Sequence, residues 1–213
     1  RQEGPHAHSL LPAPRAPGAP LFAVGCDLGL DTVSVFRLDE ADGRLLPHAD
    51  IGVSPGAGPR SVAFDAAGRH AYVMTEMAST IVVLDWDPVA GRLAPKQEIA
   101  VLESGSPGPR HGTEILLSPD GAHAYATNRG EDCIVIFRVD AGSGTLALVG
   151  RVALPGRTPR HSVFTPAGDM LLVACQDSDE ILSFRHQPGR GGLDLVARSA
   201  LPAPACLVLA DRR

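Results

Sequence analysis

A pattern of short apolar runs recurs about every 50 residues, and this repeat restricts the possible folds more than any other feature of the chain. Arg60, Arg110 and Arg160 are each 50 residues apart, and each ends a Gly-Pro-Arg or Thr-Pro-Arg tripeptide. The runs between them have the length of strands, are rich in β-branched residues, and are separated by Gly, Pro, Asp and Ser. A four-stranded unit that repeats at roughly 40 to 50 residues is typical of a β-propeller blade.

Turn glycines follow the same repeat. Each lies 13 residues before an isoleucine, in the pairs Gly68 and Ile81, Gly121 and Ile134, and Gly168 and Ile181. Because one blade cannot bury both of its faces, neighbouring blades must stack against it. We therefore expect an all-β fold, a β-propeller built from four-stranded antiparallel blades.

About four blades are expected in one domain that covers residues 1–213. The repeats fall roughly at 8–57, 58–107, 108–157 and 158–205, and the apolar run 206–209 is predicted to be the first strand of a further blade. The first repeat is the most degraded, because residues 12–20 read PAPRAPGAP and proline cannot donate to a strand ladder. We expect an incomplete part of a larger ring, and its unpaired strand edges would favour oligomerisation.

Composition indicates few partners. With 24 acidic and 19 basic residues the net charge is −5, which gives no reason to expect nucleic-acid binding. No run of about 18 apolar residues predicts a membrane span, and residues 1–9 lack an apolar signal-peptide core. We expect reduced, buried thiols and a cytoplasmic location, since no C-x-x-C pair occurs among Cys26, Cys133, Cys175 and Cys206.

The repeat also predicts where charged residues gather. In each blade, the lead-in to the first strand and the loop between the second and third strands emerge on one face of the ring. The charged residues expected there are His8, Asp27, Glu76, Arg129, the three arginines of the repeat and, more weakly, Asp177. The connections on the opposite face, such as AAGR and SPDG, are ordinary turn sequences.

Several arginines at one mouth of the channel predict an anionic ligand, because a guanidinium stays charged and binds carboxylate or phosphate through two hydrogen bonds. His8 and Glu76 could supply acid–base chemistry among them. The further candidates for substrate binding are His6, Asp27, Arg110, Glu114, Arg160 and His161. No metal-ligand spacing and no G-x-S-x-G motif occurs, and no metal or cofactor is expected.

Each candidate also has a purely structural interpretation. An arginine in a G-P-R turn often only bonds loop carbonyls, and Glu76 could simply form a salt bridge with Arg60 or Arg129. Asp27 could cap its own loop, and the histidines near the start of the chain could lie in solvent. These alternatives stay open at the level of sequence.

Seven motifs carry a family resemblance. They are PHAHS (5–9), DLGLD (27–31), GPRSVAF (58–64), YVMTEMASTI (72–81), EILLSPDG (114–121), YATNRGEDCI (125–134) and TPRHSVF (158–164). Together they resemble the propeller-type lactonases, a family that includes seven-bladed 6-phosphogluconolactonases and fungal carboxymuconate lactonizing enzymes. The resemblance implies a seven-bladed ring and a catalytic site made of His8, Arg60, Glu76 and Arg129.

The resemblance further implies hydrolysis of a small anionic sugar lactone, most simply 6-phosphogluconolactone to 6-phosphogluconate in the pentose phosphate pathway. Such a reaction needs an activated water and a stabilised oxyanion. We expect Glu76 or His8 to act as the base, with Arg60 and Arg129 holding the carbonyl oxygen and the anionic group. Two alternatives are a non-catalytic propeller that binds an anionic ligand or partner, and a muconate lactonizing enzyme (cycloisomerase).

Overall fold

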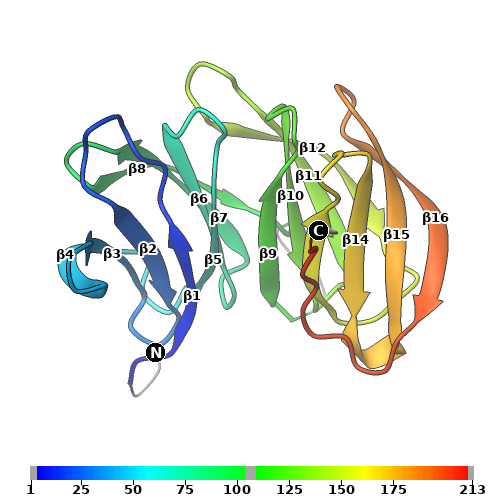
Figure 1. Ribbon diagram of the computed structural model, residues 1–213. Helices are drawn as coiled ribbons and strands as arrows, with labels where there is room; N and C mark the ends of the chain where they lie inside the picture. Colours follow the sequence, from blue (N-terminus) through cyan, green and yellow to red (C-terminus); the bar gives the residue numbers. More distant parts are fainter. Residues whose placement is uncertain (1–3, 104–108, 211–213) are drawn as a thin grey trace.

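The described residues form four separate four-stranded antiparallel sheets, each with its strands in chain order. The computed structural model describes residues 4–103 and 109–210 (Figure 1). The first strands of neighbouring sheets contact one another, so they form the inner layer of an arc of blades. The predicted all-β propeller with four-stranded blades is confirmed.

The strand bounds show the repeat directly. The first sheet contains β1 (Ala7–Pro12), β2 (Phe22–Asp27), β3 (Thr32–Asp39) and β4 (Arg44–Gly52). The second contains β5 (Pro59–Phe64), β6 (His70–Thr75), β7 (Thr80–Asp87) and β8 (Arg92–Ala100). The third contains β9 (Gly112–Leu117), β10 (His123–Asn128), β11 (Cys133–Val139) and β12 (Leu146–Ala153). The fourth contains β13 (Pro159–Phe164), β14 (Met170–Cys175), β15 (Glu180–Gln187) and β16 (Gly192–Ala200), with a short 3-10 helix η1 (Gln176–Ser178) between β14 and β15.

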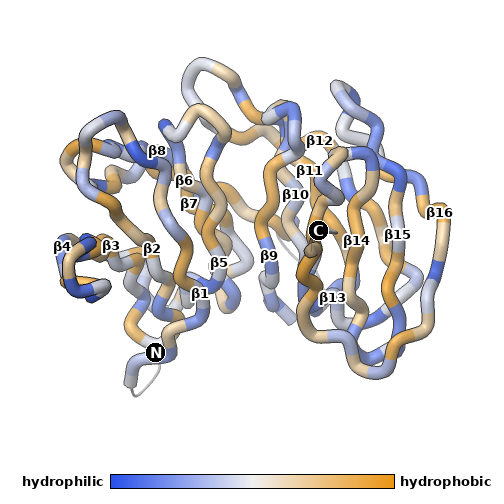
Figure 2. The backbone as a smooth tube through the Cα atoms, in the orientation of Figure 1, coloured by the Kyte–Doolittle hydropathy of each residue, from blue (hydrophilic) through white to orange (hydrophobic). Residues whose placement is uncertain are grey.

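Burial on both faces of the middle strands explains their sequence. Every residue of β6 is buried. Successive side chains of a strand point to opposite faces, so Ala71 and Val73 pack in a core shared with the first sheet, whereas Tyr72 and Met74 pack in a core shared with the third. A third core joins the third and fourth sheets. The hydropathy of the backbone follows this arrangement, with hydrophobic residues along the strands and hydrophilic ones at the turns (Figure 2).

Two tyrosines fasten the second blade to the third and the third blade to the fourth. The Tyr72 hydroxyl donates to the Gly144 carbonyl and the Tyr125 hydroxyl donates to the Gly191 carbonyl, both at 2.9 Å. Both glycines lie in the turn before the outermost strand of the following blade, at φ values of 72° and 70°. A Cβ atom there would also meet a histidine ring at 2.5–2.6 Å, so glycine is required at these contacts.

One sequence-based expectation about the last segment is wrong and another stays a prediction. Residues 206–209 are in no strand here, and their assignment to the first strand of a further blade stays a prediction. Cys206, expected to be buried, is exposed in this unpaired segment, whereas Cys26, Cys133 and Cys175 are buried free thiols. Within 4–103 and 109–210 there is also no helix long and apolar enough to cross a membrane.

We predict that Tyr125→Phe lowers the free energy of unfolding of the full-length protein by about 1 kcal/mol, because it leaves the buried Gly191 carbonyl without its donor. Urea unfolding of parent and variant would measure the difference. Equal stability would show that the hydroxyl does not hold the two blades together.

Candidate active site

A β-bulge near the start of each inner strand aims one side chain toward the axis. The extra residue is His8 on β1, Arg60 on β5 and Arg160 on β13. On β9 two residues, Thr113 and Glu114, stand opposite the one partner residue between Ala126 and Asn128. Bulges turn side chains out of the regular alternation. Since the four inner strands adjoin one another, these residues converge on one region.

Aspartates from the preceding blade hold two of the arginine lead-ins in place. Asp31 accepts hydrogen bonds from the amides of Gly56 at 2.8 Å and Gly58 at 2.9 Å. Asp132 accepts one from the amide of Thr158 at 2.7 Å. Gly58 and Thr158 are each two residues before a bulge arginine, and both aspartates have positive φ, at 54° and 43°. The backbone that carries each arginine is thereby fixed by its neighbouring blade.

Arg60, Glu76 and Arg129 form a buried ionic cluster. Arg60 Nε lies 3.0 Å from Glu76 Oε2, and Arg129 Nη2 donates to Glu76 Oε1 at 2.7 Å. The three side chains are 5%, 13% and 18% exposed, in the same order. Arg60 Nη1 also donates to the carbonyl of Thr113, which ties the second blade to the third. Removing one member of such a cluster leaves an uncompensated buried charge, at a cost of about 3–5 kcal/mol.

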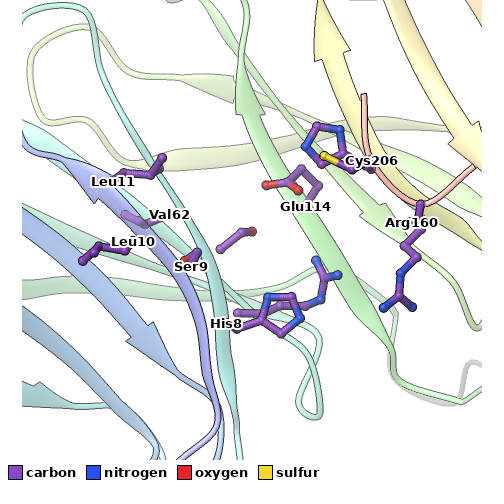
Figure 3. Close-up of a pocket in the computed structure, with 12 residues that line it drawn as sticks. His8, Ser9, Leu10, Leu11, Val62, Glu114, Arg160 and Cys206 are labelled. Carbon is purple, nitrogen blue, oxygen red and sulfur yellow. The ribbon is translucent and has the colours of Figure 1, made fainter. Parts of the chain in front are cut away.

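Two adjoining hollows lie beside this cluster. The larger, about 490 Å³, contains His8, Arg60, Glu114, Arg160, His161 and Cys206 in its lining (Figure 3). The smaller, about 310 Å³, is lined by His6, Ala7, His8, Leu28, Glu76, Arg129 and Arg160. His8 and Arg160 line both hollows, so the two hollows adjoin.

Burial and the arginine charges shift the pKa values of the residues that line the hollows. Partial enclosure, followed by the charge of Arg60, lowers the pKa of His8 and of His161, which favours the neutral form of both rings. Burial also lowers the pKa of Arg60, and the carboxylates of Glu114 and Glu76 oppose this shift. Burial raises the pKa of Glu114 to about 7.

Eight of the ten predicted site residues line the two hollows, and two do not. Asp27 accepts hydrogen bonds from the amides of His6 at 2.8 Å and of Gly29 and Leu30 at 3.0 Å, so it caps its own loop. Arg110 is exposed and donates to the Ala78 carbonyl at 3.3 Å.

The 50-residue spacing placed Arg110 wrongly because the third lead-in is longer than the others. In the third blade, Thr113 occupies the position that Arg60 has in the second. A better signal was present in the sequence, since Arg60, Thr113 and Arg160 each lie eight residues before a turn glycine. Counting back from the glycines follows strand register, whereas counting between G-P-R tripeptides includes the variable loop.

Other residues of the site were missed. His111 was not among the predicted site residues, yet its Nδ1 lies 3.9 Å from Glu76 Oε1. Asp31 and Asp132 were not among the predicted site residues, yet each directly precedes the third strand of its blade and could have been found by that shared position. Within the described ranges, no three His, Cys, Asp or Glu side chains cluster as a metal site.

Comparison with known proteins shows the family of the chain. A family described as "Lactonase, 7-bladed beta-propeller" matches residues 1–209. The chain belongs to this family. A Bacillus subtilis protein named 6-phosphogluconolactonase is 34% identical over 178 residues, which is 84% of this chain and 49% of that relative. The chain thus spans about half the length of the curated relatives it matches.

Solved structures of family members superpose closely on the four blades. A putative 6-phosphogluconolactonase from Bacteroides fragilis is 31% identical with a TM-score of 0.87, over 99% of this chain and 59% of the other. The periplasmic gluconolactonase of Pseudomonas aeruginosa is 33% identical with a TM-score of 0.87, over 96% of this chain and 56% of the other. The four sheets therefore correspond to part of a seven-bladed lactonase ring.

We predict that Asp31→Ala destabilises the full-length protein by about 1–3 kcal/mol, because it leaves two lead-in amides without an acceptor and puts alanine at positive φ. Asp31→Asn should cost less, since asparagine tolerates that conformation and keeps an acceptor oxygen. Thermal unfolding of both variants, with the exposed turn variant Asp42→Ala as control, would measure this. Equal stability of Asp31→Ala and parent would contradict the pinning of the Arg60 lead-in.

Proposed function

We propose that the full-length protein hydrolyses a phosphorylated sugar lactone, most simply 6-phosphogluconolactone to 6-phosphogluconate. The observation that carries this proposal is the convergence of Arg60, Arg129 and Arg160 on two adjoining hollows that also contain carboxyl groups. The family match and the relatives named 6-phosphogluconolactonase support it.

Arg160 is the best anchor for the phosphate. Arg60 and Arg129 already share the charge of Glu76. By contrast, Arg160 has no ion pair or side-chain hydrogen bond to any residue in 4–103 and 109–210, and it lines both hollows. A free guanidinium can form two hydrogen bonds with a phosphate.

Arg60 and Arg129 supply the positive charge that lactone hydrolysis requires. Attack of water on the carbonyl carbon places a negative charge on the carbonyl oxygen, and fixed cations in a site with little water stabilise that charge. Glu76 holds the two guanidiniums in one orientation, because each of its carboxylate oxygens contacts a different arginine. The site therefore needs no rearrangement when the charge develops.

We predict that Arg60→Ala combined with Glu76→Gln lowers kcat/KM for lactone hydrolysis by about 10²-fold or more, since it removes both the cation and its support. Hydrolysis rates of full-length parent and variant, with the spontaneous rate subtracted, would measure this. A double variant within about threefold of the parent would overturn the assignment. Binding of 6-phosphogluconate by the parent without any turnover would favour a non-catalytic role.

Arg160 should also determine the preference for a phosphorylated substrate. The names of the relatives differ in this respect, 6-phosphogluconolactonase for one and gluconolactonase for another. We predict that Arg160→Gln lowers kcat/KM for 6-phosphogluconolactone by about 10- to 100-fold, the loss expected when a charged hydrogen bond of about 1.5–3 kcal/mol is removed. The rate with unphosphorylated gluconolactone should change little.

A matched control is Arg185→Gln, which removes an exposed arginine on β15 of the same blade. It should leave both rates unchanged. Equal losses on both lactones in Arg160→Gln would show that Arg160 does not bind the phosphate.

A cytoplasmic location and association through exposed strand edges belong to the same proposal. A phosphorylated sugar does not cross membranes freely, so a preference for it favours action inside the cell, whereas one structural relative is named periplasmic. The half-exposed apolar residues of the outer strands, among them Leu195 and Val196 on β16, support association. Cell fractionation and sedimentation of the full-length protein would test these two points.

A further inference from the structure

Glu114 occupies a position that the proposed chemistry has not yet used. It lies at the bulge of β9, directly after the Thr113 carbonyl that anchors Arg60. Its carboxyl group lies in the larger hollow, whose lining also includes His8, Arg160 and Cys206 (Figure 3). It therefore faces the space that a ligand would fill.

The two acidic residues of the site differ in their partners. Glu76 is in contact with two guanidiniums at 3.0 and 2.7 Å. Glu114 has no ion pair within 4 Å among the described residues, although it is largely surrounded by protein. When two carboxyl groups sit in such different surroundings, one stays ionised and the other can exchange a proton near neutral pH.

The electrostatic surroundings of Glu114 agree with this division. Burial raises its pKa to about 7, while the charge of Arg60 and the Ser61 hydroxyl act in the opposite direction. The other titratable or charged groups around the hollow are His8 on β1, Arg160 and His161 on β13, Cys206, Cys26 on β2, and Glu76 and Arg129 on the adjoining loops. A group that titrates near pH 7 can accept and return a proton within one catalytic cycle.

We infer that Glu114 is the proton-transfer group of the site, an assignment that rests on the lactonase function proposed above. In this step the Glu114 carboxylate takes a proton from water as the water oxygen bonds to the lactone carbonyl carbon. The resulting oxyanion is stabilised by the arginines. When it collapses, the bond between the carbonyl carbon and the ring oxygen breaks, and Glu114 returns its proton to that oxygen. The products are a hydroxyl group and a carboxylic acid, and the enzyme is restored.

This assignment replaces the base expected from the sequence. Glu76 is already shared by two arginines, and proton uptake there would dissolve the ionic cluster. His8 lines both hollows from the exposed strand β1, so it is better placed to contact the substrate than to transfer protons.

The test is the pH dependence of lactone hydrolysis by the full-length protein carrying Glu114→Gln. In the parent, kcat/KM should rise with pH through about pH 7 and then level off, because the base acts when ionised. The variant should lose about 10²- to 10⁴-fold in kcat/KM and should show no rise at that pH. Glu114→Asp should keep the rise with a reduced rate, since it retains a carboxyl group.

A second readout follows the protonation of Glu114 without relying on activity. Because folding raises the pKa of this carboxyl, the folded state binds the proton more tightly than the unfolded state. The stability that this gives is present at acidic pH and falls as pH rises from about 4.5 to about 7. Glu114→Gln should remove that part of the pH dependence of unfolding, whereas the exposed control Glu98→Gln on β8 should not change it.

The outcomes separate the inference from the function beneath it. A parent without lactonase activity would overturn both. An active parent with a Glu114→Gln variant that stays within about threefold and keeps the same pH profile would overturn the role of Glu114 alone. Loss of rate together with loss of the rise near pH 7 would support it.

Discussion

Burial of both faces of each sheet is the constraint on which the structure depends. The fully buried strand β6 cannot be covered by its own blade, because its alternate side chains point in opposite directions. Neighbouring sheets must therefore be stacked on either side, and the cores shared by successive blades do this. Stacking brings the first strand of every blade to the same axis. The site is thus a geometric consequence of how the hydrophobic residues are buried.

Local irregularities of the backbone direct the side chains of the inner strands into the site. The bulges on the inner strands release His8, Arg60 and Arg160 from the strict alternation of a strand. Aspartates at positive φ fix the lead-ins. The arginine from one blade then meets a carboxylate from a loop and a carbonyl from the next blade. Because the contacts that fix the lead-ins and Arg60 come from neighbouring blades, the site depends on the blades staying packed together.

The sequence predicts the blades well because the turn glycines and isoleucines keep strand register, and it predicts the arginine-rich mouth because blade connectivity dictates which loops share a face. The sequence analysis fails where the position or burial of a residue depends on other parts of the chain. Arg110 was misplaced by a loop of variable length, and Cys206 is exposed where burial was expected. Burial in the folded ring raises the pKa of Glu114, and Arg60 and Ser61, more than 50 residues away in the chain, act on that pKa in the opposite direction. No local pattern could show that contact.

A crystal structure of the full-length protein with bound 6-phosphogluconate would test the central claim most directly. Our account predicts that the product lies in the two adjoining hollows, with its phosphate on Arg160 and its carboxylate near Arg60 and within hydrogen-bond distance of Glu114. Product bound on the opposite face, among the turns that join the first and second strands of the blades, would contradict it.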